Sequence, residues 1–451
     1  MDYHLYTSSA AKATNTSPTH SFFIDPERLS QLARESKFQQ RDGGKITPSL
    51  FVETITKAAF QQACSFRHLA VLGGSQIKDT IAKQSFWERV NSRAAKFLGS
   101  VLCEQMTSGL TLPKPIHDLI DRALVHDSSI LKLHPQLQDA FPGSRNQSAT
   151  PQSSVRVQVV ADLLSGEFLQ FGMSGFTRND QAASHDILPI IQPKDLILRD
   201  LGYFTLNSLE AIDQREAFFL SRLRYGTALF DEKEERIDLV TCLREAAREE
   251  GKSCVIEARM GATKKLPIRV VAVRLPKSVA NERRRKASAD RDKRVSHDKA
   301  YYELLGWTLL VTNLPEEAVN DLDLTKLYAL RWRIENIFKA WKSGLKPGHL
   351  SAHESNKWHL HCLLLGQMLA LSRLSRIGVF TVAGETKRGI SQGTINPSEI
   401  SLFKAIDILL LCDAAMDQAA LCDQVIAQIH YHGRYEKRKR EPLPASLAKL
   451  A

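Results

Sequence analysis

One segment of the chain, "YALRWRIENIFKAWKSG" (residues 328–344), carries polar side chains at spacings that suit a chemical site. In a helix, with about 100° between successive residues, four of them lie within roughly 60° of one another around the axis. These four are Tyr328, Arg331, Glu335 and Lys342. The opposite side carries apolar residues, namely Leu330, Ile334, Ile337 and Trp341. The pattern predicts a helix that packs through one side and presents a carboxylate flanked by cations on the other.

Two more carboxylates are expected at the ends of strands. Asp127 lies in "LVHDSSILKL" and Asp200 lies in "LILRDLGYF", each after a short β-prone run. Mg²⁺ prefers hard oxygen ligands, and two such ions about 4 Å apart activate the attacking oxygen and stabilise the leaving one in phosphodiester cleavage. Asp127, Asp200 and Glu335 are therefore candidate metal ligands. Carboxylates held close together repel, and cations such as Arg331 and Lys342 would offset that repulsion.

Each of these residues also has an ordinary structural interpretation. Asp127 in "HDSS" and Asp200 in "RDLGY" are typical of turns and caps. Arg331 and Glu335 would form a surface i,i+4 pair worth a few tenths of a kcal/mol. Periodicity and spacing alone leave both interpretations open.

The elements that must position these residues change in type along the chain. Helical periodicity dominates residues 26–112, where "TPS" (residues 47–49) predicts a helix start. Five β-prone runs follow, at residues 122–130, 155–163, 167–173, 195–204 and 217–223, with a hairpin turn predicted at "SG" (residues 165–166). Three further strand candidates, "SCVIEARM", "PIRVVAVRL" and "GWTLLVTNL", precede the signature segment. From residue 349 onward the pattern is helical, and "LLLGQMLAL" (residues 363–371) predicts a buried helix.

The composition is that of a globular protein with a polyanionic partner. Among 451 residues, Lys+Arg 61 against Asp+Glu 50 give a formal net charge of +11, which favours nucleic acid. Seven scattered cysteines without a C-x-x-C pair predict reduced thiols in the cytoplasm rather than a disulfide framework. The start lacks an apolar h-region, and no apolar run reaches about 18 residues, so neither a secretory signal nor a membrane span is expected.

The spacing Tyr-x2-Arg-x3-Glu-x6-Lys, from Tyr328 to Lys342, resembles the YREK signature of bacterial insertion-sequence DDE transposases. The surroundings of Asp127 and Asp200 resemble the first two acid motifs of this family, and "SKFQQRDGGKITPSLFV" resembles its usual opening. A β-rich stretch between the second acid and Glu335 is also a feature of the group. The resemblance covers about residues 25–375 and weakens towards the C-terminus.

The resemblance implies an α/β fold, in which an RNase H-like catalytic core is interrupted by a β-rich insertion and flanked by helical N-terminal and C-terminal regions. Residues 1–115 are expected to form a helical DNA-binding domain that begins with a loose arm of about 20 residues. Residues 116–225 would form the first part of the core, 226–313 the insertion, and 314–375 the second part of the core with the signature helix. Residues 376–451 would form a helical C-terminal region, with Cys412 and Cys422 in its core.

The resemblance also assigns the metal ligands. It implies that Asp127, Asp200 and Glu335 bind Mg²⁺, with Mn²⁺ as a substitute. The motif around the first acid is short, so Asp121 and Asp162 compete with Asp127 for that role. Asp162 fits less well, because it lies within a predicted strand before a hairpin.

Contacts with DNA are implied for four further residues. Tyr328, Arg331 and Lys342 would contact phosphates near the cleaved end. Trp307 would either stack on a base displaced from the DNA, which is worth about 1–3 kcal/mol, or pack in the core of the insertion. Two cationic runs would either contact phosphates or remain solvated: "RRRK" (residues 283–286) and "KRKR" (residues 437–440). The histidines and cysteine between residues 349 and 362 lack standard zinc spacing, which disfavours a zinc site.

These observations predict a cut-and-paste DNA transposase, cytoplasmic and associated with the nucleoid. It would bind terminal inverted repeats and target DNA, act as a homodimer in a synaptic complex, and need no membrane. By resemblance, the second strand would be cut through a hairpin. The alternatives are a catalytically inactive DNA-binding protein on a transposase scaffold and a metal-dependent nuclease of other purpose.

Overall fold

The structure is a computed structural model in which the chain divides into two compact units. It describes residues 4–7, 24–41, 43–104, 118–144, 152–165, 168–246, 253–289, 298–316, 319, 321–353, 356–390, 402–411 and 423–434. Unit 1 comprises Met1–Leu110, Asp127–Arg178 and Trp332–Ala445. Unit 2 comprises Thr111–His126, Asn179–Arg331 and Ser446–Ala451. The expected residues Cys412, Cys422 and 437–440 lie outside the described residues.

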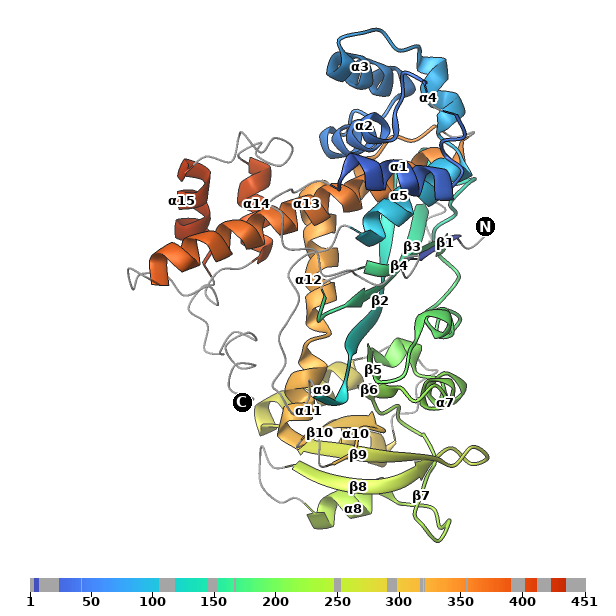
Figure 1. The fold of residues 1–451 in the computed structure, drawn as a ribbon. Coiled ribbons are helices and arrows are strands. Elements are labelled where there is room, and N and C mark those ends of the chain that lie inside the picture. Colours follow the sequence, from blue (N-terminus) through green and yellow to red (C-terminus); the bar gives the residue numbers. More distant parts are fainter. Residues whose placement is uncertain are drawn as a thin grey trace. The chain divides into compact units, whose positions relative to one another are not determined.

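Between residues 26 and 104, the described part of unit 1 forms helices, as the periodicity predicted (Figure 1). They are α1 (Pro26–Glu35), α2 (Pro48–Gln61), α3 (Phe66–Ile77), α4 (Lys83–Arg89) and α5 (Ser92–Glu104). The predicted start of α2 is confirmed, because Thr47 is its N-cap and the Thr47 hydroxyl accepts a hydrogen bond from the Leu50 amide at 3.2 Å. Such a cap satisfies one of the amide donors that a helix start leaves without an intrahelical partner.

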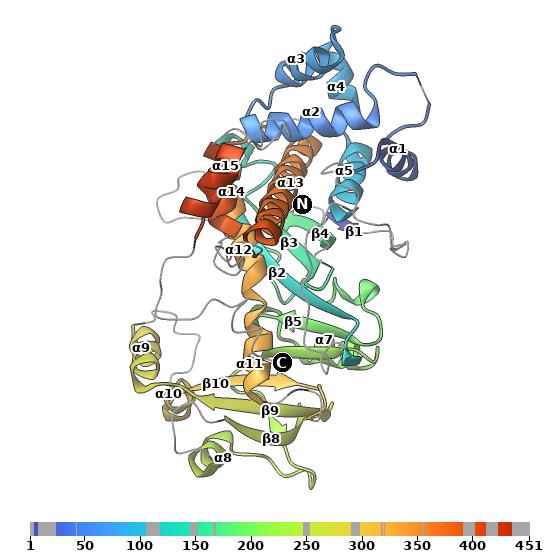
Figure 2. The same cartoon turned by 60° about the vertical axis from the view of Figure 1, so that its left-hand side comes forward.

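The long helix α13 (Lys357–Ile390; Figure 2) contributes its buried residues 359–373 to the core of unit 1. It packs against α2 and α5, and its segment 363–371 is fully buried, as predicted. An ion pair joins α13 to α2, with Arg373 donating to the Glu53 carboxylate. Helices α14 (Leu402–Leu411) and α15 (Asp423–His432) follow. Before α13 lie α12 (Trp332–Ala340), the π-helical turn η4 (Trp341–Leu345) and the 3₁₀ turn η5 (Pro347–His349).

The sheet of unit 1 has the order β1-β4-β3-β2. Its strands are β1 (His4–Thr7), β2 (Arg122–Leu133), β3 (Ser153–Asp162) and β4 (Phe168–Gly175), and a 3₁₀ turn, η1 (Pro135–Leu137), follows β2. Strands β3 and β4 are antiparallel, as the predicted hairpin requires. The prediction of a loose N-terminal arm is wrong for His4–Thr7, which pair with β4. A four-residue run carries too weak a local signal to show this, because a strand gains its hydrogen bonds from its partner.

In unit 2, β5 (Asp195–Arg199) runs parallel to β6 (Phe218–Arg222) and to the first part of β2. Strand β10 (Trp307–Thr312) pairs with both β6 and β9 (Leu266–Arg274), and β8 (Ser253–Met260) and β7 (Leu229–Phe230) complete the order. Every residue of β5 is buried, as expected for a parallel strand covered on both faces.

The helices of unit 2 are α7 (Leu206–Asp213), α8 (Leu239–Ala246), α9 (Lys277–Ser288), α10 (Lys299–Leu304) and α11 (Asp321–Ala329), with 3₁₀ turns η2 (Leu188–Ile190) and η3 (Leu201–Tyr203). In the part of the chain that the structure describes, none of the helices combines the length and the apolarity that crossing a membrane requires.

Candidate functional site

Periodicity predicted one continuous helix for the signature segment, residues 328–344. The structure has two helices there instead. Helix α11 ends at Ala329, and α12 starts only at Trp332. At the turn between them, the amide of Leu330 donates to the Leu327 carbonyl (3.1 Å) and the amide of Arg331 to the Tyr328 carbonyl (3.2 Å). These i→i+3 bonds tighten the chain and end the α-helical ladder.

The break distributes the four signature residues over both units. Tyr328 and Arg331 belong to unit 2, whereas Glu335 lies in the first turn of α12 and Lys342 in the π-helical turn, both in unit 1. On the predicted apolar side, Leu330, Ile334 and Trp341 are buried and Ile337 is half-buried. The prediction of an outward-facing polar side is wrong for Arg331, which is buried.

Tyr328, Arg331 and Asp200 influence one another electrostatically within unit 2. The Arg331 guanidinium carbon lies 5.8 Å from the centre of the Tyr328 ring. Burial raises the pKa of Tyr328 to about 12, with Asp200 adding to the rise while Arg331 and Arg222 oppose it. The Tyr328 hydroxyl therefore keeps its proton at neutral pH and can act as a hydrogen-bond donor.

Asp200 directly follows β5, as predicted, and the residue before it, Arg199, is anchored by hydrogen bonds. Arg199 is buried, and it donates hydrogen bonds to the Ser208 hydroxyl and, at 2.7 Å, to the Ser184 carbonyl. Burial lowers the pKa of Arg199 to about 10. Asp200 is the N-cap residue of η3 and thus lies at a strand-end turn, where its carbonyl accepts the Tyr203 amide at 3.1 Å, while its carboxylate does not cap the turn.

Asp127 lies within β2, not at a strand end as predicted, because β2 continues to Leu133. The preceding residue, His126, pairs in register with Arg199, the residue before Asp200. Asp127 and Asp200 therefore each follow a paired residue on neighbouring parallel strands. One oxygen of the half-buried Asp127 carboxylate, Oδ1, accepts the Ser128 amide at 2.8 Å.

The two competitors for the first acid have different surroundings. Asp162 is buried at the end of β3, where its carboxylate accepts the amides of Leu164 (3.0 Å) and Ser165 (3.1 Å). This is a turn-forming role. Asp121 is exposed and precedes β2. Of these three candidates for the first acid, Asp127 remains the best ligand, and carboxylates are the hard oxygen donors that Mg²⁺ prefers. Among the described residues, however, no three His, Cys, Asp or Glu side chains are gathered in a way that could hold a metal ion, so the structure does not bring Asp127, Asp200 and Glu335 together as a metal site.

The turn that carries Lys342 is held by buried hydrogen bonds that sequence reasoning missed, and we call them the Gln367 clamp. The neighbouring Trp341 is fully buried, and its indole Nε1 donates to Gln367 Oε1 at 3.0 Å. Gln367 Nε2 in turn donates to the carbonyls of Leu345 (2.8 Å) and Ala59 (3.3 Å). The signal was a single amide within the apolar run "LLLGQMLAL". Lys342 itself is at the surface, and partial loss of solvent around it lowers its ammonium pKa.

Trp332 is a second residue that sequence reasoning missed. It directly follows Arg331 and is 57% exposed, which is unusual for so large an apolar side chain. An exposed indole offers a face on which a base can stack.

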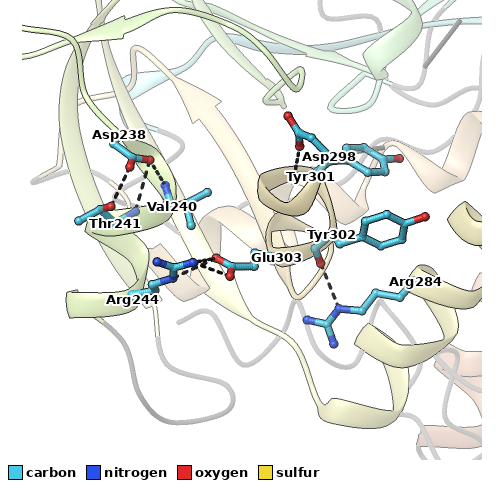
Figure 3. A network of polar contacts seen from close by, with 9 residues as sticks. All are labelled: Asp238, Val240, Thr241, Arg244, Arg284, Asp298, Tyr301, Tyr302 and Glu303. Atoms are coloured by element: carbon cyan, nitrogen blue, oxygen red, sulfur yellow. Dashed lines mark hydrogen bonds and ion pairs between the residues drawn. The ribbon is translucent and has the colours of Figure 1, made fainter. Parts of the chain in front are cut away.

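Trp307 opens β10, as predicted, and is half-buried. Its carbonyl accepts a hydrogen bond from Arg283 at 3.0 Å, and the Arg274 guanidinium carbon lies 5.8 Å from its ring centre. A cavity of about 480 Å³ adjoins it, and its lining residues include three whose polar contacts Figure 3 shows, namely Arg244, Arg284 and Glu303. There Arg244 forms an ion pair with Glu303.

The cationic run at residues 283–286 lies on α9 and is partly used for structure. Arg283 donates to the Trp307 carbonyl, and Arg284 donates to the Tyr302 carbonyl at 3.0 Å (Figure 3). Lys286 pairs with Glu282 at 3.0 Å. The prediction that these cations are simply solvated is therefore wrong for Arg283, Arg284 and Lys286, which have partners within the protein.

The histidine-rich segment before α13 does not gather metal ligands. Among the described residues, no group of three or more His, Cys, Asp or Glu side chains is arranged to hold a metal ion. His359 instead stacks on Phe66 with ring centres 4.2 Å apart, and its Nδ1 accepts the His353 amide at 3.0 Å. Burial lowers the pKa of His359 to about 4.

Known proteins resemble this chain over most of its length. A family model described as "Transposase DDE domain" matches residues 119–372. The "Transposase for insertion sequence element IS231B" of Bacillus thuringiensis subsp. berliner is 28% identical over 380 residues, which cover 77% of this chain and 76% of that protein. The "Transposase for insertion sequence element IS1151" of Clostridium perfringens is 25% identical over 408 residues, which cover 86% of this chain and 84% of that protein.

Proposed function

The chain belongs to the transposase DDE domain family and is an enzyme that cuts and joins DNA, and from this premise we propose how its residues do so. Asp127, Asp200 and Glu335 are the metal ligands. The substrate is the pair of terminal inverted repeats of an insertion sequence, as the names of the relatives suggest. The catalytic core is RNase H-like, and residues 226–313 form a β-rich insertion in it.

The observation that carries the proposal is the register of two parallel strands. His126 pairs with Arg199, and a carboxylate follows each of them, at Asp127 and Asp200. Each of these carboxylates supplies the hard oxygen ligands that Mg²⁺ prefers. Mg²⁺, or Mn²⁺ in its place, would supply Lewis-acid activation of water and of the leaving oxygen.

The remaining signature residues bind the DNA backbone. Arg331 and Lys342 supply positive charge to phosphates, and the protonated Tyr328 hydroxyl donates a hydrogen bond. Trp307 and the exposed Trp332 offer aromatic faces for unstacked bases. Two chains act together on two DNA ends, and the second strand is cut through a hairpin.

The decisive experiment uses the full chain and a duplex that carries the repeat flanking its gene. Cleavage at the repeat boundary is measured with Mg²⁺, with EDTA and with Glu335→Gln, and the matched control is Glu27→Gln at an exposed carboxylate of α1. We expect metal-dependent cleavage that Glu335→Gln abolishes while binding persists, and no effect of Glu27→Gln.

Two other outcomes would support the alternatives. Binding without cleavage by the unaltered chain, even with both ends and Mn²⁺ present, would indicate an inactive scaffold. Metal-dependent cleavage without preference for the repeat would indicate a nuclease of other purpose.

A further inference from the structure

A half-buried carboxylate outside the proposed metal ligands lies against the turn that carries Asp200. This carboxylate belongs to Asp180, in the segment that follows β4. A Cβ built on Gly202 would lie 2.9 Å from Asp180 Oδ2 and 3.3 Å from Asp180 Cβ, which is closer than real Cβ atoms approach a neighbour. The backbone of Gly202 is not left-handed, so glycine is required here for space and not for conformation.

The turn beside Asp180 is short and tightly bonded. The Asp200 carbonyl accepts the Tyr203 amide at 3.1 Å, and the Leu201 carbonyl accepts the Phe204 amide at 3.1 Å. Two successive i→i+3 bonds form a single 3₁₀ turn, which has Gly202 at its centre. A shift of the Gly202 backbone therefore also moves the backbone of Asp200, and the allowed directions of a side chain depend on that backbone.

The same turn is held at a second point by an aromatic side chain. Tyr203 is buried, and its ring centre lies 4.2 Å from that of His126, which precedes the first acid on β2. The Arg199 guanidinium carbon lies 5.8 Å from the centre of the Tyr203 ring. The turn is thus fixed by packing at Tyr203 and by the contact with Asp180 at Gly202.

The segment that carries Asp180 is anchored as well. Asn179 Oδ1 accepts the Ala182 amide at 2.9 Å, which closes a local turn around Asp180. Further along, the Ser184 carbonyl accepts a hydrogen bond at 2.7 Å from the buried Arg199, the last residue of β5. Asp180 is therefore presented to the turn by a segment that is bonded to the same strand.

We propose that Asp180 is a positioning residue: through its contact with Gly202 it fixes the turn after β5 and thereby the direction of the Asp200 carboxylate. This inference rests on the proposed function, because it concerns how one of the proposed ligands is held. Groups that act on a substrate must stay close to their productive geometry, and a displacement of about 1 Å can cost about 100-fold in rate. Asp180 needs no contact with DNA for this role.

The first test measures cleavage of the flanking-repeat duplex by the full chain with Mg²⁺ and separates kcat from KM. Asp180→Ala should lower kcat by about 10- to 100-fold and leave KM nearly unchanged, because the turn is no longer held while DNA binding is not touched. Asp180→Asn keeps the shape of the side chain and should retain most of the rate. The control, Asp139→Ala, removes an exposed carboxylate after η1 and should have no effect.

The contact itself is tested with a double variant. Gly202→Ala should also lower kcat, because the added methyl group pushes the turn and Asp180 apart. In the chain that carries both Gly202→Ala and Asp180→Ala, the two losses should not multiply, since the effects of residues in contact are not additive. Losses that multiply would show that the two residues act independently and would contradict the proposal.

Hydrogen exchange of the chain without added metal gives a readout that does not depend on cleavage. The amides of Tyr203 and Phe204 are bonded within the turn, so they should exchange faster in Asp180→Ala than in the unaltered chain or in Asp180→Asn. Denaturant unfolding checks that each variant is folded. Should Asp180→Ala fail to fold, Gly202→Ala supports the same two measurements, because it disturbs the same contact.

The outcomes separate this inference from the function on which it rests. If Asp180→Ala cuts the repeat as fast as the unaltered chain, or its turn exchanges no faster, Asp180 does not position Asp200, and the proposed function stands without it. If Asp180→Asn loses as much activity as Asp180→Ala, charge rather than the contact with Gly202 is decisive, which also overturns the inference. If the unaltered chain does not cut the repeat, the proposed function fails and this inference fails with it.

Discussion

Tyr328 combines a polar hydroxyl with a buried ring, and its protonation bears directly on its role. The pKa is raised to about 12 by burial, so the hydroxyl remains a donor throughout the neutral and mildly alkaline range. A donor that does not titrate should give a contact with phosphate that does not depend on pH.

We therefore expect Tyr328→Phe to slow cleavage of the repeat duplex by a pH-independent factor. A hydrogen bond to a charged group is worth about 1.5–3 kcal/mol, which corresponds to roughly 10- to 150-fold in rate. The rate is measured from pH 7 to pH 9.5 for both proteins. A ratio that shrinks towards pH 9.5 would show that the hydroxyl titrates in this range and would contradict the assignment.

His359 is a buried base whose neutral form the fold requires. Its pKa falls from 6.5 to about 4, so between these values the unfolded chain binds more protons than the folded one. Stability should accordingly fall as the pH drops, by about 2 kcal/mol between pH 7.5 and pH 5. Denaturant unfolding at the two pH values measures this loss, and His359→Gln should remove much of it. An equal loss in the variant would assign the pH dependence to other groups.

The π-helical turn η4 is the element that places Lys342, and it depends on one amide. Gln367 bonds to Trp341, Leu345 and Ala59 at once, so it joins α13 to η4 and to α2. Single-turn π-helices inside longer helices are frequent at functional sites, where they change the direction of a side chain.

Gln367→Leu should release this turn and leave buried polar groups of Trp341 and Leu345 without partners. Each such group costs about 1–3 kcal/mol in the free energy of unfolding. We also expect weaker binding of the repeat duplex, because Lys342 loses its fixed position. Gln84→Leu, at an exposed glutamine of α4, is the control. Reduced stability with unchanged affinity and cleavage would limit Gln367 to a structural role.

At the level of the whole molecule, the proposed reaction on two ends predicts the composition of the complex. The formal charge of +11 favours binding of duplex DNA that weakens as salt is raised. With the flanking-repeat duplex, light scattering after size exclusion should show two chains with two duplexes, whereas a scrambled duplex should not give this complex. A stable complex of one chain with one duplex that cleaves both strands would contradict the need for synapsis.

The sequence by itself determined those features whose signals are local. Thr47 before Pro48 marked the start of α2, the apolar run at residues 363–371 marked a buried helix, and Asp200 was correctly placed after β5. The spacing from Tyr328 to Lys342 also pointed to the family that the match over residues 119–372 shows. Caps, hydrophobic runs and motif spacings depend only on residues that are close in the chain, so they can be recognised from a single sequence.

Only the tertiary structure decided the features that depend on distant partners. The continuation of β2 past Asp127 and the pairing of His4–Thr7 with β4 are features that periodicity cannot specify. The helix break at Leu330 was also not predicted, although its hydrogen bonds span only three residues. The clamp of Gln367 joins residues 308 positions apart in the chain. A buried amide reveals its role only when its partners are known, because burial without them would be costly.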